Sequence, residues 1–258
     1  MEIHTDLKNT TTYTSIGGLI GETTYSQTRD LYADNIVVDA INTNYVGGIG
    51  GMIRVASMQF CYVNNCIIKG SEAVGFPDNV RLSNVGGITG MYENTMYYSG
   101  VMNTVINAAE YSNVGGVVGR LSQSLANNHY IGSCFYLADY DVETESDYNL
   151  GQNGVTRYTA AAVDDYYIKG FTNVGGIVGM QNSGYVYQSY SNGNVIAANS
   201  QIAGGISGMY CNEYTTSISN GKTYYTYSVA GMYRNYFAGN VYALQGYAGG
   251  AIGRTGML

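Results

Sequence analysis

Proline, tryptophan, histidine and charge are all scarce in this sequence. The 258 residues contain one proline, no tryptophan, two histidines and only 11% charged side chains, with 11 Lys+Arg against 18 Asp+Glu. The net charge of −7 disfavours nucleic acid and anionic membrane surfaces as partners, because both bind clustered Lys and Arg. No run of about 18 apolar residues is present, so no membrane insertion is expected.

Cysteine is also sparse. Cys61, Cys66, Cys134 and Cys211 are too few for a disulfide scaffold and form no CxxC motif. Their spacing favours buried thiols that pack as small apolar side chains, with a disulfide or a metal site as alternatives.

A secretory signal is missing from the start of the chain. Met1 to Lys8 has neither a basic start nor an apolar stretch. We therefore expect a chain that is not exported by that route, is already processed, or is a fragment or mature region of a longer protein.

Glycine and tyrosine are abundant instead. The chain has 36 glycines, 28 tyrosines and 45% hydrophobic residues. This apolar content excludes intrinsic disorder, and the glycines lack the three-residue period of collagen. The sequence must fold around a substantial core.

One phrase, an apolar residue followed by Gly-Gly-x-x-Gly, occurs seven times. The intervals between its first glycines are 30, 39, 29, 60, 29 and 45 residues, which predicts a repeat of about 30 residues. We interpret the interval of 60 as two repeats, the second of which has lost its glycines, and the intervals of 39 and 45 as repeats with insertions. The glycine pairs are Gly17/Gly18, Gly47/Gly48, Gly86/Gly87, Gly115/Gly116, Gly175/Gly176, Gly204/Gly205 and Gly249/Gly250.

Between the glycine pairs the chain has the composition of short strands. Segments such as 187–197 and 234–243 alternate apolar and polar residues around a Gly/Asn turn, and no helical periodicity is present. Three strands per repeat predict an all-β fold, a single-chain, parallel β-helix-like solenoid of about eight coils, with a right-handed sense expected from the usual crossover rule. We expect a lead-in or cap strand over 1–15, the solenoid over 16–258, and insertions near 70–82, 121–165 and 209–230.

The glycine pairs are expected to form a structural corner of each coil. Glycine permits backbone angles that other residues resist, and it lets neighbouring coils approach where a Cβ would collide. The two ends of such a stack carry unpaired backbone groups. The last repeat ends soon after Gly253, so we expect truncation or a partner at that end.

The glycine phrase, alternating with a Ser/Asn-Tyr-x-x-Gly-x-Val phrase, resembles the GLUG repeat of bacterial surface and secreted proteins. The resemblance covers residues 16–258. It implies an extracellular or cell-surface location. In that family the repeats accompany adhesins and some surface peptidases without being the catalytic part.

An acidic segment offers the clearest candidate for chemistry. Asp139, Asp141, Glu143, Glu145 and Asp147 occupy every second position, so a strand would place them on one face. We weigh an exposed acidic insertion, a calcium site and a glycosidase-like carboxylate pair. Otherwise no cofactor is expected, and neither His4 nor His129 lies in a catalytic motif.

Tyrosines two residues apart present both rings to one face of a strand. Tyr185/Tyr187 and Tyr225/Tyr227 are such pairs. They fit stabilising aromatic ladders between coils, a platform for sugars, or a lateral contact with another copy.

Together these features predict a non-enzymatic structural or adhesive module. Its expected partners are other copies of itself, flanking surface-protein domains, or a glycan or host-surface ligand. One alternative is a filament subunit that stacks end to end. Another is a polysaccharide-active enzyme, which would lose its product when Asp141 or Glu143 becomes Asn or Gln.

Overall fold

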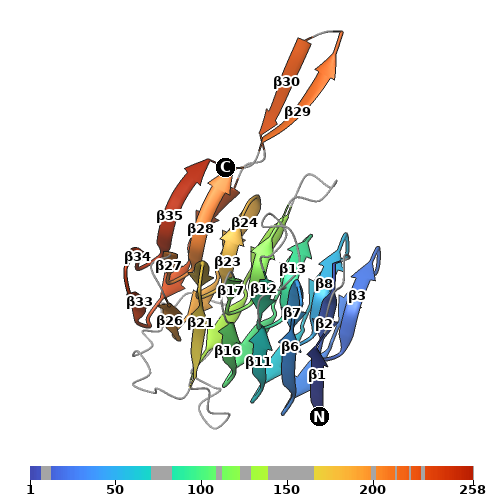
Figure 1. Cartoon of the computed structure of the whole chain (residues 1–258), viewed down its shortest axis with the longest axis vertical. Helices are drawn as coiled ribbons and strands as arrows, with labels where there is room; N and C mark the ends of the chain where they lie inside the picture. Colours follow the sequence, from blue (N-terminus) through green and yellow to red (C-terminus); the bar gives the residue numbers. More distant parts are fainter. Residues whose placement is uncertain are drawn as a thin grey trace.

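The structure is a stack of parallel β-sheets. The computed structural model describes residues 1–6, 13–70, 83–108, 112–122, 129–138, 166–198, 202–212, 214–220, 222–227 and 230–257. All regular elements in these segments are strands, which form five parallel sheets and one hairpin (Figure 1). The predicted all-β solenoid class is therefore confirmed.

Three sheets contain seven strands each. Sheet A holds β1 (Glu2–Asp6), β6 (Val37–Ile41), β11 (Ile67–Gly70), β16 (Val105–Ala108), β21 (Tyr167–Gly170), β26 (Asn194–Ala197) and β33 (Val241–Ala243). Sheet B holds β2 (Ser15–Gly17), β7 (Tyr45–Gly47), β12 (Ser83–Gly86), β17 (Ser112–Gly115), β22 (Asn173–Gly175), β27 (Ile202–Gly204) and β34 (Tyr247–Gly249). Sheet C holds β3 (Ile20–Thr24), β8 (Gly50–Arg54), β13 (Thr89–Glu93), β18 (Val118–Leu121), β23 (Val178–Gln181), β28 (Ser207–Asn212) and β35 (Ile252–Met257).

Two further sheets contain six strands each. Sheet D holds β4 (Thr28–Arg29), β9 (Met58–Gln59), β14 (Met96–Tyr97), β19 (Tyr130–Gly132), β24 (Gly184–Tyr187) and β31 (Ala230–Tyr233). Sheet E holds β5 (Tyr32–Asp34), β10 (Tyr62–Asn64), β15 (Gly100–Met102), β20 (Phe135–Leu137), β25 (Tyr190–Ser191) and β32 (Tyr236–Phe237). The chain visits the sheets in the order B, C, D, E, A.

Each coil therefore has five short strands, where the sequence predicted three. The corner between sheets E and A is the predicted Gly/Asn turn, which lies between β25 and β26 and between β32 and β33. The additional corners lie between sheets C and D and between sheets D and E, and ordinary side chains form them. Phe60, Tyr98 and Arg234 have φ values of 54°, 50° and 57° between sheets D and E, and Val55 has 50° between sheets C and D. A single left-handed residue bends the chain between two strands, and in a residue other than Gly, Asn or Asp this conformation has no reliable sequence signature.

The interval of 60 residues contains one coil, not two. Strand β17 pairs directly with β22, and Gly115 is in register with Gly175. The predicted coil that had lost its glycines is thus wrong, because the extra residues are an insertion within one coil. The described strands make six complete coils, preceded by β1 and followed by β34 and β35.

The core runs through the stack as columns of equivalent apolar residues. In sheet A, Val38, Ile68 and Ile106 are fully buried and in register. In sheet B, Val46, Val85 and Val114 form a second buried column. Because a parallel strand places alternate side chains inward, identical positions in successive coils fill the same interior space.

The glycine pairs lie where sheet B meets sheet C, but the reason for glycine is space rather than backbone angle. Among the described glycines only Gly184 has a positive φ, so the expected special angles at the pairs are wrong. A Cβ on Gly47 would lie 2.6 Å from the carbonyl oxygen of Ile88 in the next coil. On Gly176 it would meet the carbonyl oxygen of Gly205 and lie 2.7 Å from the Ser191 Oγ. Both approaches are too close for a carbon atom, so the pairs allow coils to stack at the corner.

A hairpin projects from the side of the stack. Strands β29 (Tyr214–Ser219) and β30 (Lys222–Tyr227) pair antiparallel within the predicted insertion at 209–230. Figure 1 shows them extending away from the sheets, beyond β28 and β35. The lead-in segment contains β1, an edge strand of sheet A. Most of the predicted insertions at 70–82 and 121–165 lies outside the described residues.

Candidate interaction surface

Aromatic side chains form ladders on the outer faces of sheets D and E. Tyr185 and Tyr187 alternate with buried residues on β24, so both rings lie on the outer face. Tyr187 stacks on Tyr233 of the next coil with ring centroids 5.2 Å apart, and Tyr185 stacks on Tyr130 of the preceding coil at 5.5 Å. Within sheet E, Tyr190 stacks on Tyr236 at 5.4 Å.

Glycines in the same sheets make room for these rings. A Cβ on Gly132 would lie 2.6 Å from the Tyr187 ring, and Gly100 and Gly231 are covered in the same way by Phe135 and Tyr185. Tyr187 thereby reaches across Gly132 to Tyr97, with ring centroids 6.2 Å apart in an edge arrangement. Tyr187 thus covers the backbone at Gly132 and links coils that are not adjacent.

The ladders favour a stabilising role over a sugar platform. A sugar stacks on a free ring face, but the near-parallel pairs use their faces for each other. The interplanar angles are 10° for Tyr187 and Tyr233 and 11° for Tyr190 and Tyr236. Desolvation first, and the adjacent Tyr97 hydroxyl second, raise the pKa of Tyr187 well above its ordinary value. The Tyr187 hydroxyl therefore stays neutral at physiological pH.

For two sets of predicted site residues the structure describes no side-chain positions, so those predictions stay untested. Tyr225 and Tyr227 lie on β30, opposite Thr216 and Tyr214 in the hairpin, but their side chains are outside the described part of the structure. Asp139, Asp141, Glu143 and Glu145 also lie outside the described residues.

An asparagine ladder, which sequence reasoning missed, crosses three coils of sheet B. Asn84, Asn113 and Asn173 are buried and in register. The Nδ2 of Asn113 donates to Oδ1 of Asn84 at 2.8 Å, and the Nδ2 of Asn173 donates to Oδ1 of Asn113 at 2.7 Å. Its signal was present in the sequence, because Ser/Thr-Asn-Val precedes these three glycine pairs.

The four cysteines are free and buried. They pack as the small buried side chains expected, and none forms a disulfide. Burial raises the pKa of Cys134 to about 12, and it also raises the pKa values of Cys61 and Cys66. Cys61 also joins neighbouring coils through its backbone, since its amide donates to Ser99 Oγ of the next coil at 3.1 Å.

The two histidines lie apart. His4 is exposed on β1, with Nε2 3.2 Å from Glu2 Oε2, whereas His129 is buried just before β19. In the segments that the structure describes, no three His, Cys, Asp or Glu residues are arranged to hold a metal ion. Those segments likewise contain no helix able to cross a membrane.

Comparison with protein-family models, with curated proteins and with solved structures finds no match to this chain.

Proposed function

We propose that the chain is a non-enzymatic structural and adhesive module, which holds a binding hairpin on a rigid β-solenoid support. The observation that carries this proposal is the β29–β30 hairpin, which projects from a stack with a continuous core (Figure 1). The resemblance to GLUG repeats supports an extracellular or bacterial cell-surface location and a glycan or host-surface ligand.

The stack is suited to support rather than to catalysis. Its outer columns consist of stacked rings on sheets D and E, and its buried columns are apolar side chains and asparagines. Ladders of this kind fix each coil to its neighbours, so a force on one coil is distributed along the stack. Such a support keeps a projecting element at a constant position.

Replacing residues 214–227 by a short Gly-Ser turn tests the adhesive role. We expect the shortened protein to unfold at the same temperature as the wild type, because β28 and β31 keep their own sheet partners. Binding of the labelled protein to a glycan array and to immobilised extracellular-matrix glycoproteins should be lost. The substitution Tyr242→Ala, an exposed ring on sheet A, serves as the control that keeps binding. Equal binding by the shortened protein would contradict the role of the hairpin.

A further inference from the structure

The two ends of the stack are the edges of the same sheets. Strands β1, β2 and β3 are edge strands of sheets A, B and C at one end, and β33, β34 and β35 are edge strands at the other. An edge strand presents backbone donors and acceptors in the direction of the missing neighbour. In Figure 1 the hairpin leaves the side of the stack, so it does not cover the end formed by β33 to β35.

At the glycine corner one end of the stack offers backbone donors and the other end offers backbone acceptors. At all six junctions between described coils, three N–H groups donate forward to the next coil. Gly205 donates to the Gly249 carbonyl at 3.1 Å, and Ile206 and Ser207 donate to the Ala251 carbonyl at 2.9 and 3.0 Å. At the first junction, Gly18 donates to Gly47, and Leu19 and Ile20 donate to Ile49. Gly250, Ala251 and Ile252 hold the donor positions at the last corner, and Gly17 and Leu19 hold the acceptor positions at the first.

Gly250 occupies the repeat position at which a following coil requires glycine, but no described coil follows it. A Cβ on Gly18, Gly48, Gly87, Gly116, Gly176 or Gly205 would in every case meet the glycine carbonyl of the next coil. A Cβ on Gly250 would meet nothing within 4 Å. Glycine is therefore present at a position where only a further coil would require it.

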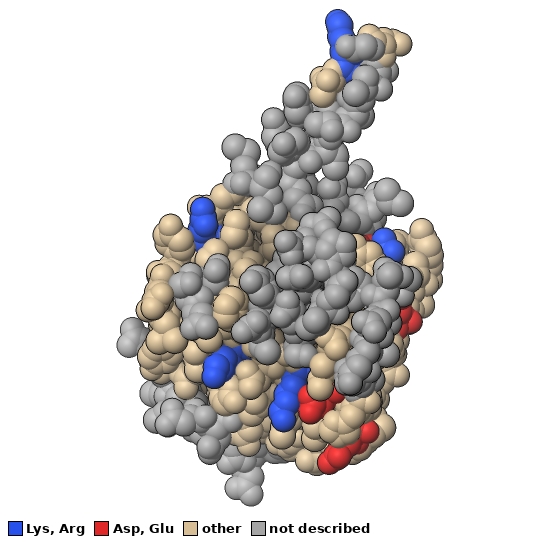
Figure 2. All heavy atoms as spheres, in the orientation of Figure 1, with Lys and Arg blue, Asp and Glu red and all other residues tan. Residues whose placement is uncertain are grey.

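Charge at the two ends is also complementary. Residues 230–257 contain Arg234 and Arg254 and no acidic residue. The first strands and corners contain the acidic residues Glu2, Glu22, Asp30 and Asp34, against one arginine, Arg29 on β4. On the face shown in Figure 2, acidic residues gather on the side of the N-terminal strands and are absent on the side of β33 to β35.

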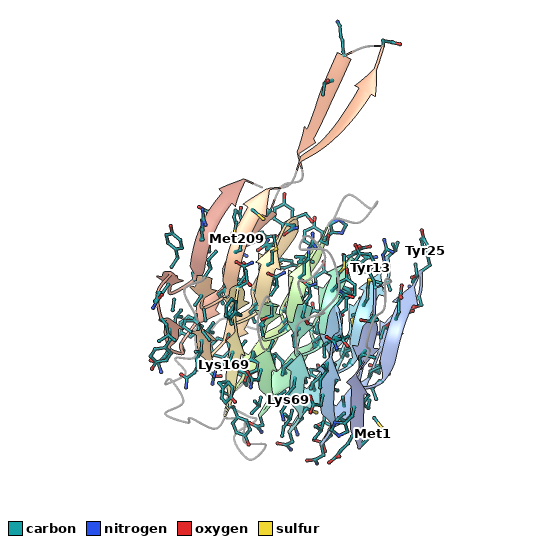
Figure 3. The ribbon with its side chains drawn as sticks, in the orientation of Figure 1. Met1, Tyr13, Tyr25, Lys69, Lys169 and Met209 are labelled. Atoms are coloured by element: carbon teal, nitrogen blue, oxygen red, sulfur yellow. The ribbon has the colours of Figure 1, made fainter. Side chains whose placement is uncertain are left out.

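These charges occupy matching columns. On sheet C the column that begins with Glu22 and Met52 ends with Met209 and Arg254; Met209 is labelled in Figure 3. A further coil with the sequence of the first would place a Glu22 next to Arg254. The stack already contains such a pair, since Arg54 and Glu93 are in register on neighbouring coils and their Nε and Oε2 atoms are 3.0 Å apart.

We infer that a second copy of this chain binds head to tail, with its β1, β2 and β3 continuing sheets A, B and C beyond β33, β34 and β35. This inference extends the structural role proposed above and names its partner. Val241, Ala248 and Ile252 of one copy would contact Ile3, Ile16 and Ile20 of the next. Sheets D and E have one strand fewer, so an opening one strand wide separates Arg234 of one copy from Asp30 of the next.

Charge reversal at each end tests the contact. The tail variant, R234D/R254E, changes the end formed by β33 to β35 and so carries acidic groups at both ends. The head variant, E22R/D30R, changes the end formed by β1 to β3 and so carries basic groups at both ends. We expect each to associate at least about tenfold more weakly than the wild type at low salt, because like charges then face each other. An equimolar mixture should recover association, because every junction again joins opposite charges. Sedimentation velocity over a concentration series measures all three.

Two controls keep the test decisive. K69E/K222E changes the net charge by the same amount as R234D/R254E, but its substitutions lie on β11, an interior strand of sheet A, and at the hairpin tip. It should therefore associate like the wild type. Gly250→Val should keep its thermal unfolding temperature and lose association. A wild-type chain that stays at one-chain mass overturns the inference, as does association unaffected in R234D/R254E. Hairpin binding is measured on the single chain, so the two proposals fail separately.

Discussion

Replacing Gly176 by valine should strongly destabilise the fold. The new Cβ would meet the carbonyl oxygen of Gly205, and it would lie 2.7 Å from Ser191 Oγ. The carbonyl belongs to the backbone of the next coil, so relief requires the coils to separate at a junction that contains three hydrogen bonds. We expect a loss of about 4 kcal/mol or more, against a typical domain stability of about 5 to 15 kcal/mol. Circular dichroism and urea unfolding of the purified variant measure it.

Gly250→Val is the matched control for this prediction. It makes the same change at the same place in the repeat, where a Cβ has no neighbour within 4 Å. The single chain should therefore keep its unfolding free energy to within about 0.5 kcal/mol. A Gly176→Val protein with wild-type stability would contradict the close-approach explanation of the glycine pairs.

Replacing Asn113 by alanine should have the second largest effect. Asn113 is fully buried in the middle of the asparagine ladder. Its loss leaves Oδ1 of Asn84 without this donor and Nδ2 of Asn173 without its acceptor. Each buried group left without its bond costs about 1 to 3 kcal/mol. We expect a decrease of about 3 to 5 kcal/mol in the unfolding free energy, measured by chemical denaturation.

An exposed asparagine pair provides the comparison. Asn240 Nδ2 donates to Oδ1 of Asn194 on the neighbouring coil at 3.0 Å, but in contact with solvent. Asn240→Ala should therefore cost less than about 1 kcal/mol, because water replaces the lost partner. Equal losses for Asn113→Ala and Asn240→Ala would show that burial of the ladder contributes nothing.

The class of fold could be predicted because its signal is local and repeated. The Val-Gly-Gly phrase fixes the corner between sheets B and C, and alternation along strands such as β24 places Tyr185 and Tyr187 on the outer face. The number of strands per coil could not be predicted in the same way. Corners at Phe60 and Tyr98 use left-handed backbone without glycine, so nothing in the residue types marks them.

The number of coils was inferred from the intervals between glycine pairs, and one of these intervals allows two interpretations. An interval of 60 residues fits two coils, and it also fits one coil with a long insertion; only the pairing of β17 with β22 separates these cases. The stacking of tyrosine faces was likewise beyond sequence reasoning. Spacing places two rings on one side of a strand, but the angle between rings depends on the neighbouring coil, including Gly132 and Gly231.

Both proposals require a stack that continues without interruption across the long insertion. Asn107 on β16 and Lys169 on β21 are in register across this junction, on strands about 4.8 Å apart. That separation is within the range for a disulfide, whereas an intervening coil would place them about 10 Å apart, beyond that range. The native cysteines are buried and do not compete.

Oxidative cross-linking of N107C/K169C therefore tests the continuous stack most directly. The matched control is K69C/K169C, in which the residues lie two coils apart on the same sheet and are labelled in Figure 3. Peptide mapping under non-reducing conditions should show a disulfide between the introduced thiols in N107C/K169C and none in the control. A folded N107C/K169C protein that forms no disulfide would contradict the continuous stack, and with it the basis of both proposals.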